Sequence, residues 1–187
     1  MRMLRPFVPS LAMLLLATSG AAAQGVLIDR SEIGFVSKQM GANVEGRFRK
    51  WKARVDWKPD DLGRSRADLE IDLASIDLAS EESETEVRRP RWFDTAKFPV
   101  ASFQSSKVTN LGGERYEIAG KLTMKGTTRD VAIPVQIRKD AAGNTVSEGQ
   151  FTIRRLDFNV GDGRWSDPTV VADDVLVRVR MVLPRSA

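Results

Sequence analysis

The sequence predicts an all-β fold of about eight antiparallel strands with one short helix. In the segments 131–137 and 175–183, apolar side chains fall on every second residue. This alternation is typical of an antiparallel strand with one buried face. Turn-forming sequences separate such segments at near-regular spacing, as at Asn110-Leu111-Gly112-Gly113 and Lys125-Gly126-Thr127-Thr128. Short strands spaced in this way indicate a sandwich or a closed barrel.

The other strands follow from the same pattern, and one of them changes phase. They are expected at Glu32–Lys38, Val44–Trp57, Arg66–Leu73, Ala101–Val108, Arg115–Met124 and Asn144–Arg154. In the strand Val44–Trp57 the apolar parity shifts after Phe48, so one extra residue must be accommodated near Arg49-Lys50. We expect a β-bulge there that bends the strand, as at the corner of a barrel.

One helix is expected at Glu81–Arg89. Ser80 provides an N-cap, the acidic residues lie in the first turn where the helix dipole favours them, and Pro90 ends the helix. The acidic cluster is also compatible with a metal site, but a solvated helix face accounts for its spacing and charge. The stretch that follows, 92–105, holds four of the thirteen aromatic residues and fits no regular element before Val100. We interpret it as a lip or plug over an apolar space.

The first 23 residues carry the three features of a secretory signal peptide. Arg2 and Arg5 are followed by an apolar run at 11–17, which is too short to span a bilayer, and by Ala21-Ala22-Ala23. Cleavage is expected between Ala23 and Gln24. This pattern predicts export to the periplasm.

The remaining residues, 24–187, have the length of one domain. Removal of the signal peptide lowers the net charge from +4 to +2, which is no nucleic-acid signature by itself. No later segment is long and apolar enough to predict a transmembrane helix. The sequence has no cysteine, so it forms no disulfide and carries no cysteine-linked lipid anchor.

The residue inventory argues against an enzyme. Without His or Cys the chain lacks a Ser-His-Asp triad, a cysteine nucleophile and the usual zinc sites. Paired carboxylates remain possible, with Asp94, Asp157 and Asp162 as candidates, but nothing in the sequence brings two of them together. We therefore expect no catalysis, no metal and no cofactor.

Two further motifs have simple interpretations. The segment 47–54 mixes basic and aromatic residues as single-strand nucleic-acid binders do, but in a strand its cations fall largely on the outer face. They are available there to an anionic headgroup or membrane surface. The segment 161–167 lacks the spacing and the bidentate Glu of an EF-hand, so we expect a loop near the barrel mouth, with Arg164 available to a polar head.

Five motifs occur in an order that resembles the YceI-like family. They are Gly41–Phe48, Ile71–Asp77, Trp92–Ser106, Ala119–Val131 and Arg155–Phe158. The resemblance implies an exported polyisoprenoid-binding protein with an extended, lipocalin-like barrel and an isoprenoid lipid in its lumen. Many members have histidines near the first strand and before the Phe-Asp motif, whereas this chain has none. It resembles a subset with cytochrome b561-type membrane partners, which implies a quinone-type ligand and such a partner.

Alternation and family position together predict the lumen. The wider set of inward residues is Phe35, Val44, Phe48, Val55, Phe103, Leu122, Ile133, Val135, Phe151, Ile153, Phe158, Val177 and Val179. The residues predicted to bind the ligand are Phe35, Phe48, Val55, Trp92, Phe93, Phe98, Phe103, Phe151, Phe158, Arg164 and Trp165. Of these, Trp92, Phe93 and Phe98 are expected at the mouth.

Two alternatives remain at this point. The inward residues are equally compatible with plain core packing, which would make the protein a ligand-free structural or interaction module. A membrane-spanning barrel needs an apolar outer face, but Arg178 and Arg180 alternate with the inward pair Val177 and Val179. That polarity favours a barrel with an apolar lumen that does not span the membrane.

Overall fold

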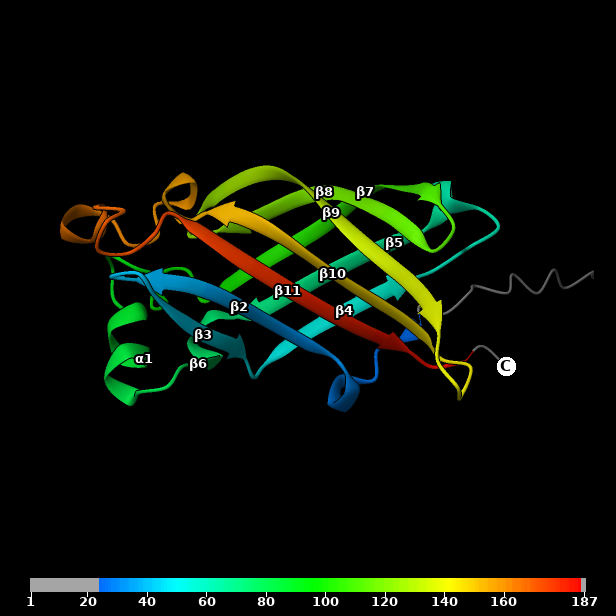
Figure 1. Cartoon of the computed structure of the whole chain (residues 1–187), viewed down its shortest axis with the longest axis horizontal. Helices are drawn as coiled ribbons and strands as arrows, with labels where there is room; N and C mark the ends of the chain where they lie inside the picture. Colours follow the sequence, from blue (N-terminus) through cyan, green and yellow to red (C-terminus); the bar gives the residue numbers. More distant parts are fainter. Residues whose placement is uncertain (1–23, 186–187) are drawn as a thin grey trace, which may run out of the picture.

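The computed structural model describes residues 24–185, which form an antiparallel β-barrel with one α-helix (Figure 1). Eleven strands belong to a single sheet. The strands are β1 (Gln24–Gly25), β2 (Glu32–Gln39), β3 (Ala42–Phe48), β4 (Trp51–Asp56), β5 (Arg66–Asp72), β6 (Ile76–Asp77), β7 (Val100–Gly112), β8 (Arg115–Met124), β9 (Thr127–Lys139), β10 (Thr145–Arg154) and β11 (Asp174–Leu183), and the helix is α1 (Glu81–Val87). The all-β expectation is confirmed. The strand number differs because one expected strand divides in two, and β1 and β6 have only two residues each.

The alternation of apolar residues predicted the positions of the long strands, because one face of each strand is buried. In β9, Ile133 and Val135 are each 8% exposed, whereas their neighbours Pro134 and Gln136 are exposed. The strand β8 has the expected bounds, and β7 and β9 extend further than expected. β7 bends at two irregularities in its pairing with β8, between Ser105 and Lys107 and between Asn110 and Gly112.

The expected bulge near Arg49-Lys50 is instead a break between β3 and β4. The Arg49 amide donates to the Ser75 carbonyl (3.0 Å), and the Asp72 amide donates to the Lys50 carbonyl (3.0 Å). The Ser75 hydroxyl accepts from the Lys50 amide (3.0 Å). The break therefore faces the 3-10 turn Leu73–Ser75 between β5 and β6. The segment β3–β4 and the segment β5–β6 bend side by side at this point.

This shared bend closes the sheet. The strand order is β1-β4-β5-β7-β8-β9-β10-β11-β2-β3-β6, so β4 lies near one end and β3 near the other. Only two residues separate β3 from β4 along the chain. The consecutive strands β3 and β4 form one bent segment, and β5 and β6 form another. Because β4 pairs with β5 while β3 pairs with β6, these two bent segments lie side by side and connect one end of the strand order to the other.

The helix α1 ends two residues earlier than expected. The Ser80 hydroxyl accepts from the Ser83 amide (3.1 Å), which confirms the N-cap. At the other end the Arg89 amide donates to the Glu86 carbonyl (3.0 Å) in a tighter turn. Pro90 disfavours helical geometry at the residue before it, so the last turn cannot continue.

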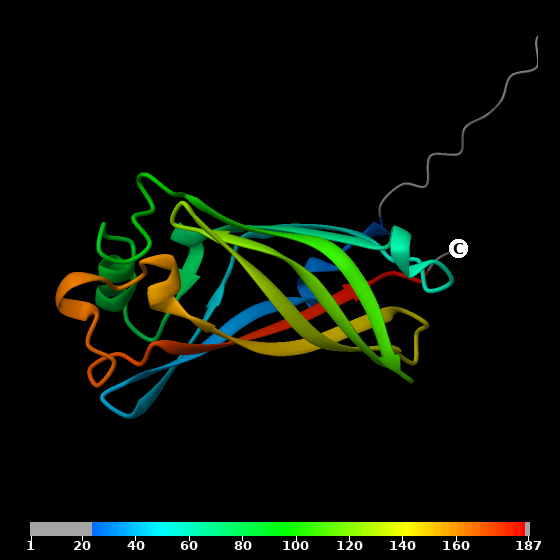
Figure 2. The same cartoon turned by 90° about the horizontal axis from the view of Figure 1, so that it is seen from above.

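The two ends of the barrel differ, as Figures 1 and 2 show. At one end lie α1, the segment 88–99 and the loop 155–173, which we call the cover. At the opposite end, the far end, lie the β9–β10 turn, the 3-10 turn Leu62–Arg64 and the last described residues. The predicted signal peptide 1–23 lies outside the described residues, and Gln24 begins β1 by pairing with Val55.

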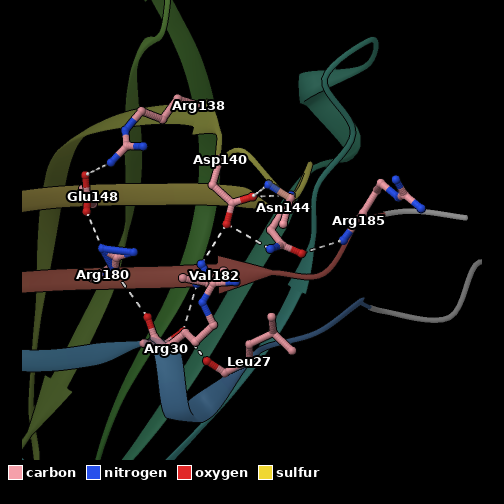
Figure 3. A network of polar contacts seen from close by, with 11 residues as sticks. Leu27, Arg30, Arg138, Asp140, Asn144, Glu148, Arg180, Val182 and Arg185 are labelled. Atoms are coloured by element: carbon pink, nitrogen blue, oxygen red, sulfur yellow. Dashed lines mark hydrogen bonds and ion pairs between the residues drawn. The ribbon is translucent and has the colours of Figure 1, made fainter.

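A polar network fixes the turn at the far end (Figure 3). Asp140 Oδ2 accepts from Arg30 Nη2 (2.8 Å), and Asp140 also accepts from the amide and side chain of Asn144 (2.9 Å each). These contacts lower the pKa of Asp140, first through the Asn144 side chain, against an opposing effect of burial. Asn144 Oδ1 accepts in turn from the Arg185 amide (3.2 Å).

A second part of the network ties the strands together (Figure 3). Glu148 on β10 accepts from Arg138 on β9 (3.0 Å) and from Arg180 on β11 (2.8 Å). The Leu27 amide donates to the Val182 carbonyl (2.8 Å), so the segment before β2 is held against β11. These contacts order the far end without placing charge inside the barrel.

Candidate functional site

The barrel encloses a cavity of about 440 Å³. Apolar residues from nearly every long strand line it, and residues of the cover close around one end. The lining from the cover consists of Glu82, Ser83, Glu86, Val87, Trp92, Phe93, Arg155, Val160, Trp165 and Val171. A cavity of this size and character falls in the range of small-molecule sites.

Most of the residues predicted to bind ligand lie on the cavity wall. They are Phe35, Phe48, Val55, Trp92, Phe93, Phe103, Phe151 and Trp165. Alternation also placed further lining residues correctly, namely Val44, Leu122, Ile133, Val135, Ile153, Val177 and Val179. Their contact with a ligand stays a prediction.

Three of the predicted residues lie elsewhere. Phe158 is 2% exposed and belongs to the core, because it lies in the 3-10 turn Arg155–Phe158, where strand alternation no longer applies. Phe98 packs against Gly126, at the β8–β9 turn, with Lys97 Nζ 5.1 Å from its ring centroid. Arg164 is exposed and lies over the ring of Trp165, at 4.9 Å.

The aromatic residues at the cover end form two contacting groups. Phe48 lies 5.7 Å from Phe35 and 6.3 Å from Phe93, measured between ring centroids. Trp92 lies 5.6 Å from Trp165. Tilted and edge-on geometries at these distances stabilise aromatic pairs. The two tryptophans thereby join the segment 88–99 to the loop 155–173.

A buried arginine, which the sequence did not reveal as a site residue, organises this end. Arg155 is 3% exposed and its guanidinium donates five hydrogen bonds to backbone carbonyl oxygens. The acceptors, at 2.6–3.0 Å, belong to Val160, Gly161, Trp165, Val171 and Ala172. Burial lowers the pKa of Arg155, and the charge of Asp173 opposes that shift. Each donor of the guanidinium fork is satisfied, so this one side chain holds the loop 155–173 in shape.

Glu86 links the helix to that loop. Its Oε1 accepts from the indole nitrogen of Trp165 (3.1 Å) and lies 3.5 Å from Arg164 Nη2, while its Oε2 accepts from Arg89 Nη1 (2.7 Å). On the other side of the loop, Lys125 Nζ donates to the Asn159 carbonyl (2.6 Å). The cover is thus a connected unit made of segments far apart in the sequence.

The cavity wall is mostly apolar and also carries Asp68, Glu82, Glu86 and Arg155. Asp94, Asp157 and Asp162 do not line it. Among residues 24–185 no cluster of three or more His, Cys, Asp or Glu residues could hold a metal ion. Within the same range no helix has the length and apolar character to cross a membrane.

A closed antiparallel barrel around an apolar cavity is the architecture of lipocalin-like binding proteins. Comparison with known proteins places the chain more narrowly: residues 26–183 match the YceI-like domain, and the chain belongs to that family.

The chain is also similar to individual relatives and solved structures. The crystal structure of Burkholderia cenocepacia BcnA has a TM-score of 0.81 and 37% identity, covering 84% of this chain and 98% of that chain. A polyisoprenoid binding domain from Saccharophagus degradans shares the fold, with a TM-score of 0.69 at 16% identity, covering 88% of this chain and 99% of that one. UPF0312 proteins of Vibrio cholerae are 27% identical over 129 residues, which cover 68% of this chain and 64% of theirs.

Proposed function

We propose that this protein binds an isoprenoid lipid, a polyisoprenoid or a quinone-type molecule, inside its barrel. The observation that carries the proposal is the apolar cavity enclosed by the strands and the cover. The polyisoprenoid-binding domain of Saccharophagus degradans, which shares the fold, supports the choice of ligand class. The proposed role is to hold or carry the lipid, with no chemical step.

Apolar burial suffices for useful affinity. Burying two prenyl units, about ten carbons, gives a gross gain of about 8 kcal/mol at about 0.8 kcal/mol per carbon. Ordering the chain and losing its translational freedom reduce this gain. Each further buried prenyl unit adds about 4 kcal/mol, and about −8 kcal/mol net corresponds to a Kd of about 1 μM.

We also propose that the protein acts in the periplasm after cleavage between Ala23 and Gln24, and that a cytochrome b561-type membrane protein is its partner. The three-part signal pattern supports export. Mass spectrometry of the protein from a periplasmic extract tests it, because the mature protein must begin at Gln24. An uncleaved chain in the cytoplasmic fraction would contradict export.

The test of lipid binding is mass spectrometry of organic extracts from the protein purified from its native host. The expected result is a co-purified isoprenoid lipid at near-stoichiometric amount. Ala53 on β4 lines the cavity, so Ala53→Trp should exclude the lipid, whereas Lys52→Trp places the same ring on the exposed face and should retain it.

The alternative is the ligand-free structural or interaction module. It is favoured if the native protein yields no lipid and takes up no isoprenoid quinone in vitro. Recovery of a phospholipid or fatty acid would keep the cavity as a lipid site and refute the isoprenoid assignment.

A further inference from the structure

The cavity reaches the protein surface at one side of the cover end. Gln39 at the end of β2 and Glu82 and Ser83 on α1 line the cavity and are also exposed to solvent. Asp68 on β5 is exposed as well, but both its neighbours in the strand line the cavity, so alternation turns its side chain away from it. Figures 1 and 2 show α1 and the β2–β3 hairpin at the same end of the barrel. We call the space between them the side opening.

One border of the side opening is a strand edge without a partner. β3 pairs with β2 over residues 42–47, but it pairs with β6 only at Arg47 and Phe48. The segment before α1 lies beside this edge, since a Cβ at Gly46 would come within 2.8 Å of Leu78 Cδ2. Within residues 24–185 no other strand pairs with β3, so residues 42–45 have a strand neighbour on one side only. A ligand can pass this edge without breaking the strand hydrogen bonds that close the rest of the wall.

The inner face of the hairpin becomes polar towards the side opening. The inward residues of β2 are, in order along the strand, Ile33, Phe35, Ser37 and Gln39. The first of them is 2% exposed, whereas Gln39 is exposed. Polar side chains at inward positions are favourable only where water reaches them. Water therefore reaches the side opening, and the wall deeper in the barrel is apolar.

The loop 155–173 holds both sides of the side opening. Trp165 Nε1 donates to Glu86 on α1 (3.1 Å), and the Met40 amide at the tip of the hairpin donates to the Val170 carbonyl (2.9 Å). The helix and the hairpin are thereby attached to one loop at separate places. The width of the opening depends on how far apart that loop keeps them.

Arg155 fixes the two attachment places relative to each other. Its guanidinium donates to the carbonyl oxygens of Trp165 (2.7 Å) and Val171 (2.6 Å), and Val171 forms a β-bridge with Gln39. Its guanidinium carbon also lies 5.7 Å from the ring centroid of Trp92. One buried side chain thus keeps the loop end of the side opening at a set width.

We propose that the lipid enters and leaves the cavity sideways, through the side opening between α1 and the β2–β3 hairpin. Its apolar tail goes in first, and its polar head stays beside Gln39, Glu82 and Ser83. The inference rests on the proposed lipid binding and adds the route and the direction of the ligand.

The test uses single cysteines, because the chain has none of its own. Ser83→Cys places a thiol at the side opening. Thr85→Cys places one on an exposed residue of the same helix that does not line the cavity, and Ala142→Cys places one in the exposed β9–β10 turn at the far end. Each variant is measured before and after reaction with a bulky maleimide, so each serves as its own reference.

The probe is a ubiquinone with two prenyl units, whose quinone quenches tryptophan fluorescence, and Trp92 and Trp165 line the cavity. Stopped-flow mixing gives the association rate, and displacement by excess prenol gives the release rate. The label on Ser83→Cys should slow both rates roughly tenfold, an added barrier of about 1.4 kcal/mol, and leave the dissociation constant unchanged. The labels on Thr85→Cys and Ala142→Cys should change neither rate.

Three results would overturn the side opening as the route. They are unchanged rates after labelling of Ser83→Cys, slower association after labelling of Ala142→Cys, and a label on Ser83→Cys that speeds release without slowing association. The last result would mean that this position touches the bound lipid without guarding its entrance. Binding of neither the ubiquinone nor a prenol by the wild type in equilibrium titrations would overturn the proposed function itself.

Discussion

Replacing Arg155 by Met should destabilise the protein strongly, although Arg155 makes no ion pair within the described chain. The substitution keeps a similar buried volume and removes the donors of five backbone carbonyls. At about 1 kcal/mol for each unmet acceptor, the loss is about 5 kcal/mol. Removing the buried charge offsets part of this loss of stability, since burying the charge is itself unfavourable. We expect a net loss of about 3 kcal/mol in the free energy of unfolding.

The adjacent Arg154 provides a matched control. Its side chain is 64% exposed and forms one ion pair, with Asp173 at 2.8 Å. Arg154→Met should cost less than about 1 kcal/mol, as exposed pairs do. Urea unfolding followed by circular dichroism measures both variants. For Arg155→Met the midpoint should shift, whereas the slope should stay that of the wild type.

Arg155→Lys keeps the charge with only three donors, so its stability should fall between those of the wild type and Arg155→Met. This variant keeps the prediction testable if Arg155→Met fails to fold. Equal midpoints for Arg155→Met and Arg154→Met would refute the reasoning, because they would mean that the carbonyl contacts do not stabilise the loop.

Three further perturbations test the cavity and the far end. A Cβ at Gly46 would overlap the ring of Phe35, so Gly46→Ala should push that ring into the cavity. The variant should lose about 1–3 kcal/mol of unfolding free energy in urea and should take up less lipid in a titration. Unchanged lipid uptake would contradict this. Phe93→Ala should lower lipid uptake and Phe98→Ala should not, because only Phe93 lines the cavity; an equal loss would show that the cavity is not the site. Asp140 has a folded pKa below its unfolded value of about 3.9, so its contribution to stability is present above about pH 4 and is lost as the pH falls. The stability difference between wild type and Asp140→Asn should therefore shrink in urea titrations from pH 6 towards pH 2, and a difference constant with pH would contradict the lowered pKa.

Local patterns predicted the strands because each strand's inner face is buried independently of which strand lies beside it. The parity change after Phe48 was visible for the same reason. The sequence did not show whether a bulge or a break causes this change, since both give the same change of parity. The structure has a break because the neighbouring turn Leu73–Ser75 supplies the acceptors. The Ser75 carbonyl accepts a hydrogen bond from the Arg49 amide, and the Ser75 hydroxyl accepts one from the Lys50 amide.

The site was predictable where it consists of strand positions and less so in the cover. Phe35 and Phe103 face inward by alternation, and both line the cavity. Phe98 and Phe158 lie in irregular backbone, where no period fixes the direction of a side chain. Arg155 begins one of the five family motifs, but its burial was not predicted, because an arginine directly after a strand is ordinarily exposed.

The sequence by itself determined the all-β class, the approximate strand bounds and the capped helix, since each depends on residues close together in the chain. It also determined the family, since the order of the five motifs can be read along the chain without the fold. The tertiary structure decided how the barrel closes, which aromatic residues reach the cavity, and that Trp92 and Arg155 meet at one end of it. Those features depend on contacts between segments such as 88–99 and 155–173. No local periodicity encodes such contacts, because they arise only when the folded sheet brings the two segments together.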